Sequence, residues 1–152
     1  MLARDLAAIT YKRRTYSNPF LGEDGQQSGK FSLVSANSSQ LYLTCLPETT
    51  ELRANGQDVA VIPVELTDKS GTRRVLQDRE VSVAVTGKRD AGTLAGFGTA
   101  EASTYANFTD TTVKSYYGRA MAVVRAGLQE GQLSVTFSAP GCEPVTCVIN
   151  VT

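Results

Sequence analysis

The 152-residue sequence contains neither histidine nor tryptophan, and its 15 acidic residues balance its 15 basic residues. Histidine is the commonest general base and a common metal ligand, so triads of the Ser-His-Asp or Cys-His type cannot be built from this chain alone. Nucleic-acid binding draws its affinity mainly from Lys and Arg side chains that neutralise phosphates. Because the chain has no basic excess, its composition argues against a nucleic-acid partner.

Membrane and cofactor signals are absent as well. No apolar run approaches the length of a membrane span, and Arg4 and Asp5 lie where a secretory signal would need its apolar segment. We therefore expect no membrane partner and no targeting signal in this chain, although the address of a longer parent protein would lie on other residues. Residues 95–100 contain only two glycines and precede no helical pattern, which excludes a dinucleotide-binding loop, and we expect no cofactor.

The three cysteines, Cys45, Cys142 and Cys147, match no zinc-site spacing and have no histidine partners. One interpretation is that they are small buried apolar residues, since free cysteine is among the most buried residue types. A second interpretation is a contact between Cys45 and Cys147, because both occupy alternating apolar positions in the first and last strands predicted below. If that pair were oxidised, it would close nearly the whole fold.

From residue 40 onward, apolar residues recur at every second position, the spacing of a strand with one face on a core and the other in water. Segments rich in Asn, Asp and Gly separate the runs, and helical periodicity is nearly absent. The pattern predicts an all-β fold, an immunoglobulin-like antiparallel β-sandwich of about seven strands. The runs are residues 41–46, 60–67, 81–85, 93–97, 119–125, 133–138 and 145–151.

The first 39 residues have a different pattern. Residues 6–16 are typical of one strand with a basic end, and residues 17–30, rich in Gly, Ser, Asn and Gln, predict a loop or linker. We interpret residues 1–39 as an N-terminal extension, or as the end of a preceding domain plus a linker. Residues 40–152 form the predicted sandwich.

One predicted loop, residues 99–117, contains four aromatic residues: Tyr105, Phe108, Tyr116 and Tyr117. Exposed aromatic rings on sandwich loops stack on the apolar faces of sugars, so these residues are candidates for contacting a glycan. The alternative is that the rings cover an edge of the sandwich or dock on a preceding domain. The absence of tryptophan, the strongest stacking residue, favours this alternative. Neighbouring acidic pairs such as Asp78 and Glu80 are expected on a solvated face, and no catalytic or metal-binding residue is assigned.

Several segments together resemble one known domain. They are the turn LRANGQD at residues 52–58, VAVIPVELTDKSG at 59–71, GKRDAGTLAGFG at 87–98, YGRAMAVVR at 117–125 and the last hairpin at 131–151. In order and pattern this set resembles the C-terminal immunoglobulin-like domain of bacterial glycoside hydrolase family 2 enzymes, which are β-galactosidase-like. The resemblance covers about residues 40–152.

This resemblance implies a large exported or periplasmic enzyme in which a central β/α barrel catalyses hydrolysis and the terminal sandwich is non-catalytic. Retaining hydrolysis needs two carboxylates about 5 Å apart in a sugar cleft, and a β/α barrel alone takes about 250 residues. We therefore expect a non-catalytic accessory domain of a β-galactosidase-like enzyme. Its partners would be other domains of the parent and, as a further candidate, carbohydrate. The alternative is an adhesin-like surface domain that binds a glycan or a protein.

Overall fold

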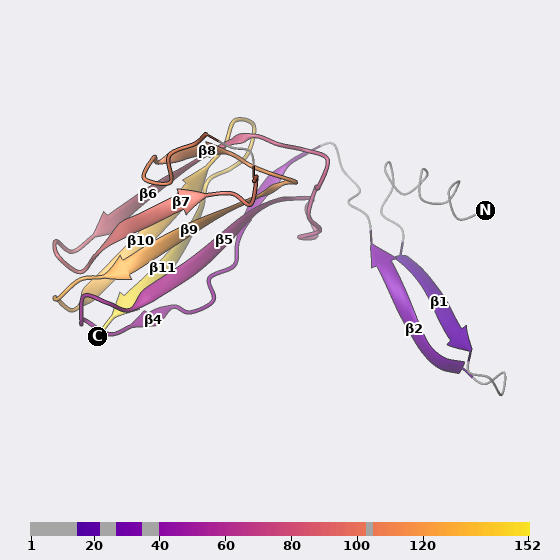
Figure 1. The fold of residues 1–152 in the computed structure, drawn as a ribbon, viewed down its shortest axis with the longest axis horizontal. Coiled ribbons are helices and arrows are strands. Elements are labelled where there is room, and N and C mark those ends of the chain that lie inside the picture. The colour runs from indigo at the N-terminus through magenta and orange to yellow at the C-terminus, as the bar shows by residue number, and fades with distance from the viewer. Residues whose placement is uncertain (1–14, 22–26, 35–39, 103–104) are drawn as a thin grey trace.

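The computed structural model describes residues 15–21, 27–34, 40–102 and 105–152, and all regular elements within these ranges are strands (Figure 1). Two strands precede the sandwich, β1 (Thr15–Leu21) and β2 (Gln27–Val34). Nine strands build the sandwich: β3 (Tyr42–Cys45), β4 (Glu51–Leu52), β5 (Val59–Thr67), β6 (Glu80–Gly87), β7 (Gly92–Gly98), β8 (Thr112–Lys114), β9 (Arg119–Ala126), β10 (Gly131–Ser138) and β11 (Val145–Val151).

Two sheets form the sandwich, as predicted (Figure 1). The four-stranded sheet has the order β3-β5-β9-β7, and every neighbouring pair in it is antiparallel. The five-stranded sheet has the order β4-β11-β10-β6-β8. Its one parallel pair joins β4 to β11, which departs from the antiparallel expectation.

All seven predicted strands form. The two additional sandwich strands, β4 and β8, contain only two and three residues, which is too short for an alternating pattern to show. The core between the sheets takes alternate residues of the long strands, such as Ile62 and Val64 of β5 and Val135 of β10. At its centre the rings of Phe97 and Phe137 lie 6.1 Å apart. Full burial of each such side chain contributes about 1.5–3 kcal/mol to folding.

The prediction of a loop over residues 17–30 is wrong, because most of that segment lies in the antiparallel hairpin of β1 and β2. Gly, Ser, Asn and Gln are unfavourable in strands only weakly and in a context-dependent way, so composition did not exclude a hairpin. The predicted strand at residues 6–16 falls outside the described residues except for its last two, which begin β1. The division at residue 39 stays a prediction.

The turn at residues 52–58, which contributes to the family resemblance, is held by its own side chains. Asn55 Oδ1 accepts a hydrogen bond from the Asp58 N–H at 2.9 Å, and Asn55 Nδ2 donates to the Asp58 carboxylate at 2.7 Å. Arg53 Nε donates to the same carboxylate at 3.0 Å. These bonds, first from Arg53 and then from Asn55, hold the pKa of Asp58 well below its usual range. The motif is therefore a structural turn.

Candidate functional site

The outer face of the five-stranded sheet is polar. Outward side chains of neighbouring strands bond to one another at Ser82–Thr112, Thr136–Thr146 and Gln132–Asn150, with distances of 2.8, 2.8 and 3.0 Å. This pattern is typical of an antiparallel sheet that presents one face to water. Val148 of β11, at 39% exposure, is an isolated large apolar side chain on this face.

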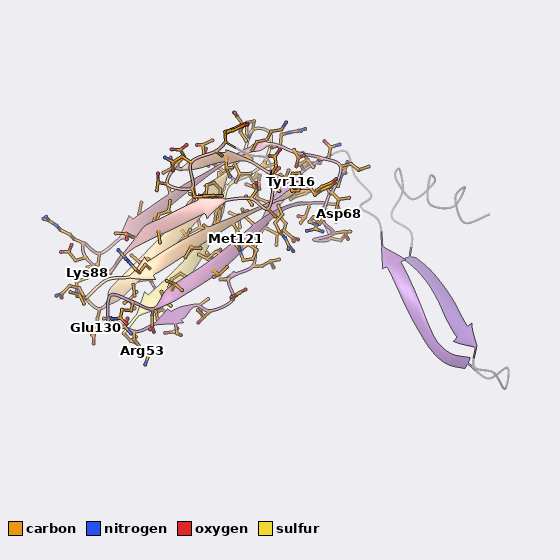
Figure 2. The ribbon with its side chains drawn as sticks, in the orientation of Figure 1. Arg53, Asp68, Lys88, Tyr116, Met121 and Glu130 are labelled. Carbon is orange, nitrogen blue, oxygen red and sulfur yellow. The ribbon has the colours of Figure 1, made fainter. Side chains whose placement is uncertain are left out.

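The outer face of the four-stranded sheet is apolar at its centre. The register places Pro63 of β5 opposite Met121 of β9, and Val61 opposite Val123. Leu46 continues the row beyond β3, where its N–H donates to the Pro63 carbonyl at 2.9 Å. Leu46 and Met121 are 47% and 45% exposed, and Figure 2 labels Met121 over the middle of this sheet.

Phe108 extends this surface over β7, the edge strand of the sheet. The Phe97 N–H donates to the Phe108 carbonyl at 2.8 Å. The Phe108 ring lies against Gly98, since a Cβ at that glycine would fall 2.3 Å from the ring. Gly98 is paired with Met121, so the ring sits beside the apolar row while remaining 56% exposed. Phe108 therefore covers a sandwich edge and still presents apolar surface.

We call the following set the apolar face: Leu46, Val61, Pro63, Phe108, Met121 and Val123. Sequence reasoning did not single it out, although the signal was present. In residues 59–64 and 120–124 both alternating sets are apolar, whereas a half-solvated strand alternates apolar with polar residues. A strand with this pattern has apolar side chains on both faces, and each face is shielded from water only when it packs against other protein.

Tyr116 and Tyr117 lie in a tight turn immediately before β9. Their rings meet edge to face, with centroids 4.6 Å apart, and they are 36% and 56% exposed. Tyr117 and Gly118 have φ of 49° and 72°, and two successive left-handed residues define a type I′ turn. Backbone bonds of 2.9 and 3.1 Å between Tyr116 and Arg119 close the turn.

Asp78 holds this turn in place. Its Oδ1 accepts hydrogen bonds from the Gly118 N–H at 3.0 Å and from the Ser115 hydroxyl at 2.9 Å. The same hydroxyl accepts a bond from the Arg79 N–H at 3.1 Å. Sequence reasoning assigned Asp78 to a solvated face, because nothing local marks a partner 37 positions away.

The turn of residues 116–119, which we call the aromatic turn, lies at the end of the sandwich where the chain enters β3. The Leu66 N–H donates to the Gly118 carbonyl at 2.8 Å, and Thr67 at the end of β5 pairs with Tyr42 at the start of β3. Figure 2 shows Tyr116 toward the same end as Asp68, away from Arg53, Lys88 and Glu130. The turn thus lies at the end of the sandwich where β3 begins.

A buried carboxylate borders the apolar face at this end. Glu65 is 8% exposed and lies opposite Arg119 in the register. Arg119 Nε donates to Glu65 Oε1 at 2.8 Å, its Nη2 contacts the same oxygen, and Arg73 Nη1 approaches it at 3.7 Å. Two partly exposed guanidinium groups therefore compensate one buried negative charge.

The four predicted aromatic residues do not form one continuous ring cluster. Tyr105 is fully exposed in its loop, and the Phe108 ring packs against Gly98 of β7. Among the described aromatic side chains, ring contacts join Tyr116 to Tyr117 and Phe97 to Phe137. Their contact with a glycan or a neighbouring domain stays a prediction. Among the residues that the structure describes, no group of three His, Cys, Asp or Glu side chains is arranged to bind a metal ion. No helix in those ranges has the length and apolarity to span a membrane.

Comparison with known proteins confirms the family resemblance. Residues 43–148 match the family described as glycoside hydrolase family 2 C-terminal domain 5. The structure is similar to a glycosyl hydrolase family 2 member from Bacteroides cellulosilyticus, with 25% identity, a TM-score of 0.84, and coverage of 93% of this chain and 18% of that chain. It is also similar to a β-glycosidase from Bacteroides vulgatus, with 16% identity, a TM-score of 0.78 and the same two coverages.

A family 2 β-glucuronidase shares the fold at 20% identity, with a TM-score of 0.71 over 90% of this chain and 14% of that chain. None of the curated protein sequences compared matches this chain. The chain thus spans about a fifth of the length of the first similar structures. Residues 40–152 are about three quarters of the chain, so a match that covers 93% of the chain also includes part of residues 1–39.

Proposed function

This chain belongs to the glycoside hydrolase family 2 C-terminal domain 5 family, and from that premise we propose that it is a non-catalytic accessory domain that docks on the rest of its parent enzyme through the apolar face. The observation that carries the proposal is the contrast between the two outer sheet faces. One is lined by hydrogen-bonded polar pairs. The other presents adjoining apolar side chains from β5 and β9, from Leu46 just after β3, and from the Phe108 loop that packs over β7.

Contiguous exposed apolar surface on a domain marks an interaction site more reliably than scattered apolar residues do. Leu46, Met121 and Phe108 are each about half exposed, so covering them would bury the remaining part of each side chain. At about 1.5–3 kcal/mol for a complete burial, each contributes roughly 1 kcal/mol to docking. A docked surface of this kind would hold the sandwich in a fixed position.

We propose that the occupant is another part of the parent chain. The supporting observation is that this chain covers only 18% of a family 2 enzyme chain to which it is 25% identical. The aromatic turn at Tyr116 and Tyr117, directed toward the point of chain entry, would contact the preceding domain at the border of the same interface. This assignment gives the candidate aromatic residues a packing role in place of sugar binding.

The proposal extends to the parent enzyme. We propose that it hydrolyses glycans with β-galactosidase-like chemistry in a barrel outside this chain, and that it acts in the periplasm or outside the cell. Similar structures include a β-glycosidase and a β-glucuronidase, so the assay uses nitrophenyl β-galactoside and β-glucuronide side by side. This chain alone is expected to hydrolyse neither, and measurable turnover by it would refute the non-catalytic role.

The docking test uses two lysine substitutions on opposite faces. Met121→Lys lies on the apolar face, and Val148→Lys is its matched control on the polar face, with similar exposure of 45% and 39%. In this chain alone, both variants should unfold within about 0.5 kcal/mol of the unmodified chain, as surface substitutions do. In the intact parent, Met121→Lys should lower the unfolding temperature and expose the sandwich to proteolysis, whereas Val148→Lys should not.

Equal behaviour of the two variants in the parent would refute docking through the apolar face. Calorimetric titration of this chain with galactosides and oligosaccharides tests the sugar-binding alternative. Heat at millimolar ligand that disappears when Tyr117 is replaced by Ala would favour a glycan site over the packing role of the aromatic turn.

A further inference from the structure

Two of the three cysteines face each other across the core. Cys45 ends β3 in the four-stranded sheet, and Cys147 lies in β11 of the five-stranded sheet. Cys45 pairs with Val64 and Cys147 with Val135, both inward residues, so the two thiols point into the space between the sheets. Cys45 is the side-chain neighbour that interacts directly with Cys147. Both cysteines thus occupy inward positions on contacting strands, as the second interpretation of the sequence requires.

We propose that Cys45 and Cys147 are a disulfide-forming site that crosslinks the two sheets when the chain meets an oxidising disulfide. Both cysteines are free thiols in this structure. A disulfide needs Cβ atoms that point toward each other from backbones a few ångströms apart. Cys45 and Cys147 occupy inward-facing positions on β3 and β11, two strands that contact each other across the core.

The reaction is thiol–disulfide exchange with a disulfide R–S–S–R. The Cys45 thiolate attacks one sulfur of R–S–S–R, which forms a mixed disulfide on Cys45 and releases one R–SH. The Cys147 thiolate then attacks the Cys45 sulfur, which forms the protein disulfide and releases the second R–SH. The protein loses two electrons and two protons, and both pass to the two R–SH molecules.

The two thiols differ in their exposure to solvent, so they differ in how readily they meet the external disulfide. Cys45 is half-buried, whereas Cys147 is buried at 8% exposure. Burial, and then the neighbouring Cys45, raise the pKa of Cys147 to about 12, so the folded chain holds little Cys147 thiolate near neutral pH. We expect the native chain to oxidise at least about tenfold more slowly than chain that refolds in the same buffer, where both thiols are transiently open to solvent.

Cys142 provides the internal control. It lies in the loop between β10 and β11, half-buried, and its N–H donates to the Ala139 carbonyl at 3.1 Å. Burial raises its pKa and the nearby Arg79 opposes that shift. The proposal leaves this thiol unpaired, so a Cys142→Ala variant removes the third thiol without touching the pair.

The experiment refolds the full 152-residue chain in oxidised and reduced glutathione, quenches it with acid, and counts free thiols after denaturation without reductant. The unmodified chain should fall from three free thiols to one, and Cys142→Ala should fall from two to none. Mass spectrometry of unreduced peptides should find residue 45 joined to residue 147. Cys45→Ala should form no internal crosslink.

Two results would overturn the proposal. One is retention of all three thiols, or the appearance of glutathione adducts with no internal crosslink. The other is a crosslink that includes Cys142. Because the measurement needs neither the parent enzyme nor its activity, its outcome is independent of the docking proposal.

Discussion

Replacing Asp78 by alanine tests whether one carboxylate holds the aromatic turn. The substitution removes the acceptor of two hydrogen bonds, from the Gly118 N–H and from the buried Ser115 hydroxyl. Bonds to a charged acceptor contribute about 1.5–3 kcal/mol each. Because water replaces part of this at a half-buried site, we expect a loss of about 2–3 kcal/mol in the free energy of unfolding. For a chain of this size that lowers the melting temperature by roughly 5–10 °C.

The assay is thermal and urea unfolding followed by far-ultraviolet circular dichroism. Near-ultraviolet dichroism adds a local reading, because no tryptophan masks the signal of the Tyr116–Tyr117 ring pair. Asp78→Asn is the matched control, since its side-chain oxygen still accepts both bonds, and it should lose about 1 kcal/mol or less. The reasoning is refuted if Asp78→Ala is within 0.5 kcal/mol of the unmodified chain, or if both variants lose the same amount.

Three further outcomes are expected. Phe137→Ala, which removes a fully buried ring from the core centre, should cost about 3–5 kcal/mol in guanidinium unfolding, and a cost below 1 kcal/mol would contradict the packing described. Gly98→Val should displace the Phe108 ring, because even a Cβ would fall 2.3 Å from it, and should speed proteolytic cleavage within residues 99–111. Gly71→Val meets open space but a φ of 80° that disfavours valine, so it should strain only its own turn and leave that cleavage unchanged. The reduced chain should lose stability as the pH rises from about 9 toward 12, by up to about 1.4 kcal/mol per pH unit. The reason is that the raised pKa of Cys147 keeps its thiol protonated in the folded chain at a pH where the unfolded chain has released that proton. The Cys147→Ala variant should lack this loss.

The strands were predictable because their signal is local. Period-two alternation over six or more residues fixes which side chains face the core, and residues 60–67 and 133–138 were assigned that way. A strand of two residues such as β4 carries no period, so only its pairing with β11 defines it. Polar composition predicts a loop where the hairpin of β1 and β2 forms, because Gly, Ser, Asn and Gln disfavour strands only weakly.

The candidate site was less predictable because it depends on register. Sequence alone showed that Phe108 was aromatic and in a loop, but its position over Gly98 arises from a backbone bond to Phe97. Likewise, Glu65 and Arg119 are 54 positions apart and meet only because β5 and β9 are aligned as they are. Contacts of this kind leave no spacing that a single sequence displays.

The position of β3 at an edge has a consequence for the order in which the sandwich opens. β3 contains four residues and bonds within its sheet only to β5, whereas β9 is bonded on both sides, to β5 and β7. Local opening starts where few hydrogen bonds must break together, so amide hydrogens of β3 should exchange with solvent before those of β9. Leu46 follows directly on β3, and the first region to open therefore includes one margin of the apolar face together with Cys45. A crosslink from Cys45 to β11 would tie that margin to a seven-residue strand that pairs along its length with β10.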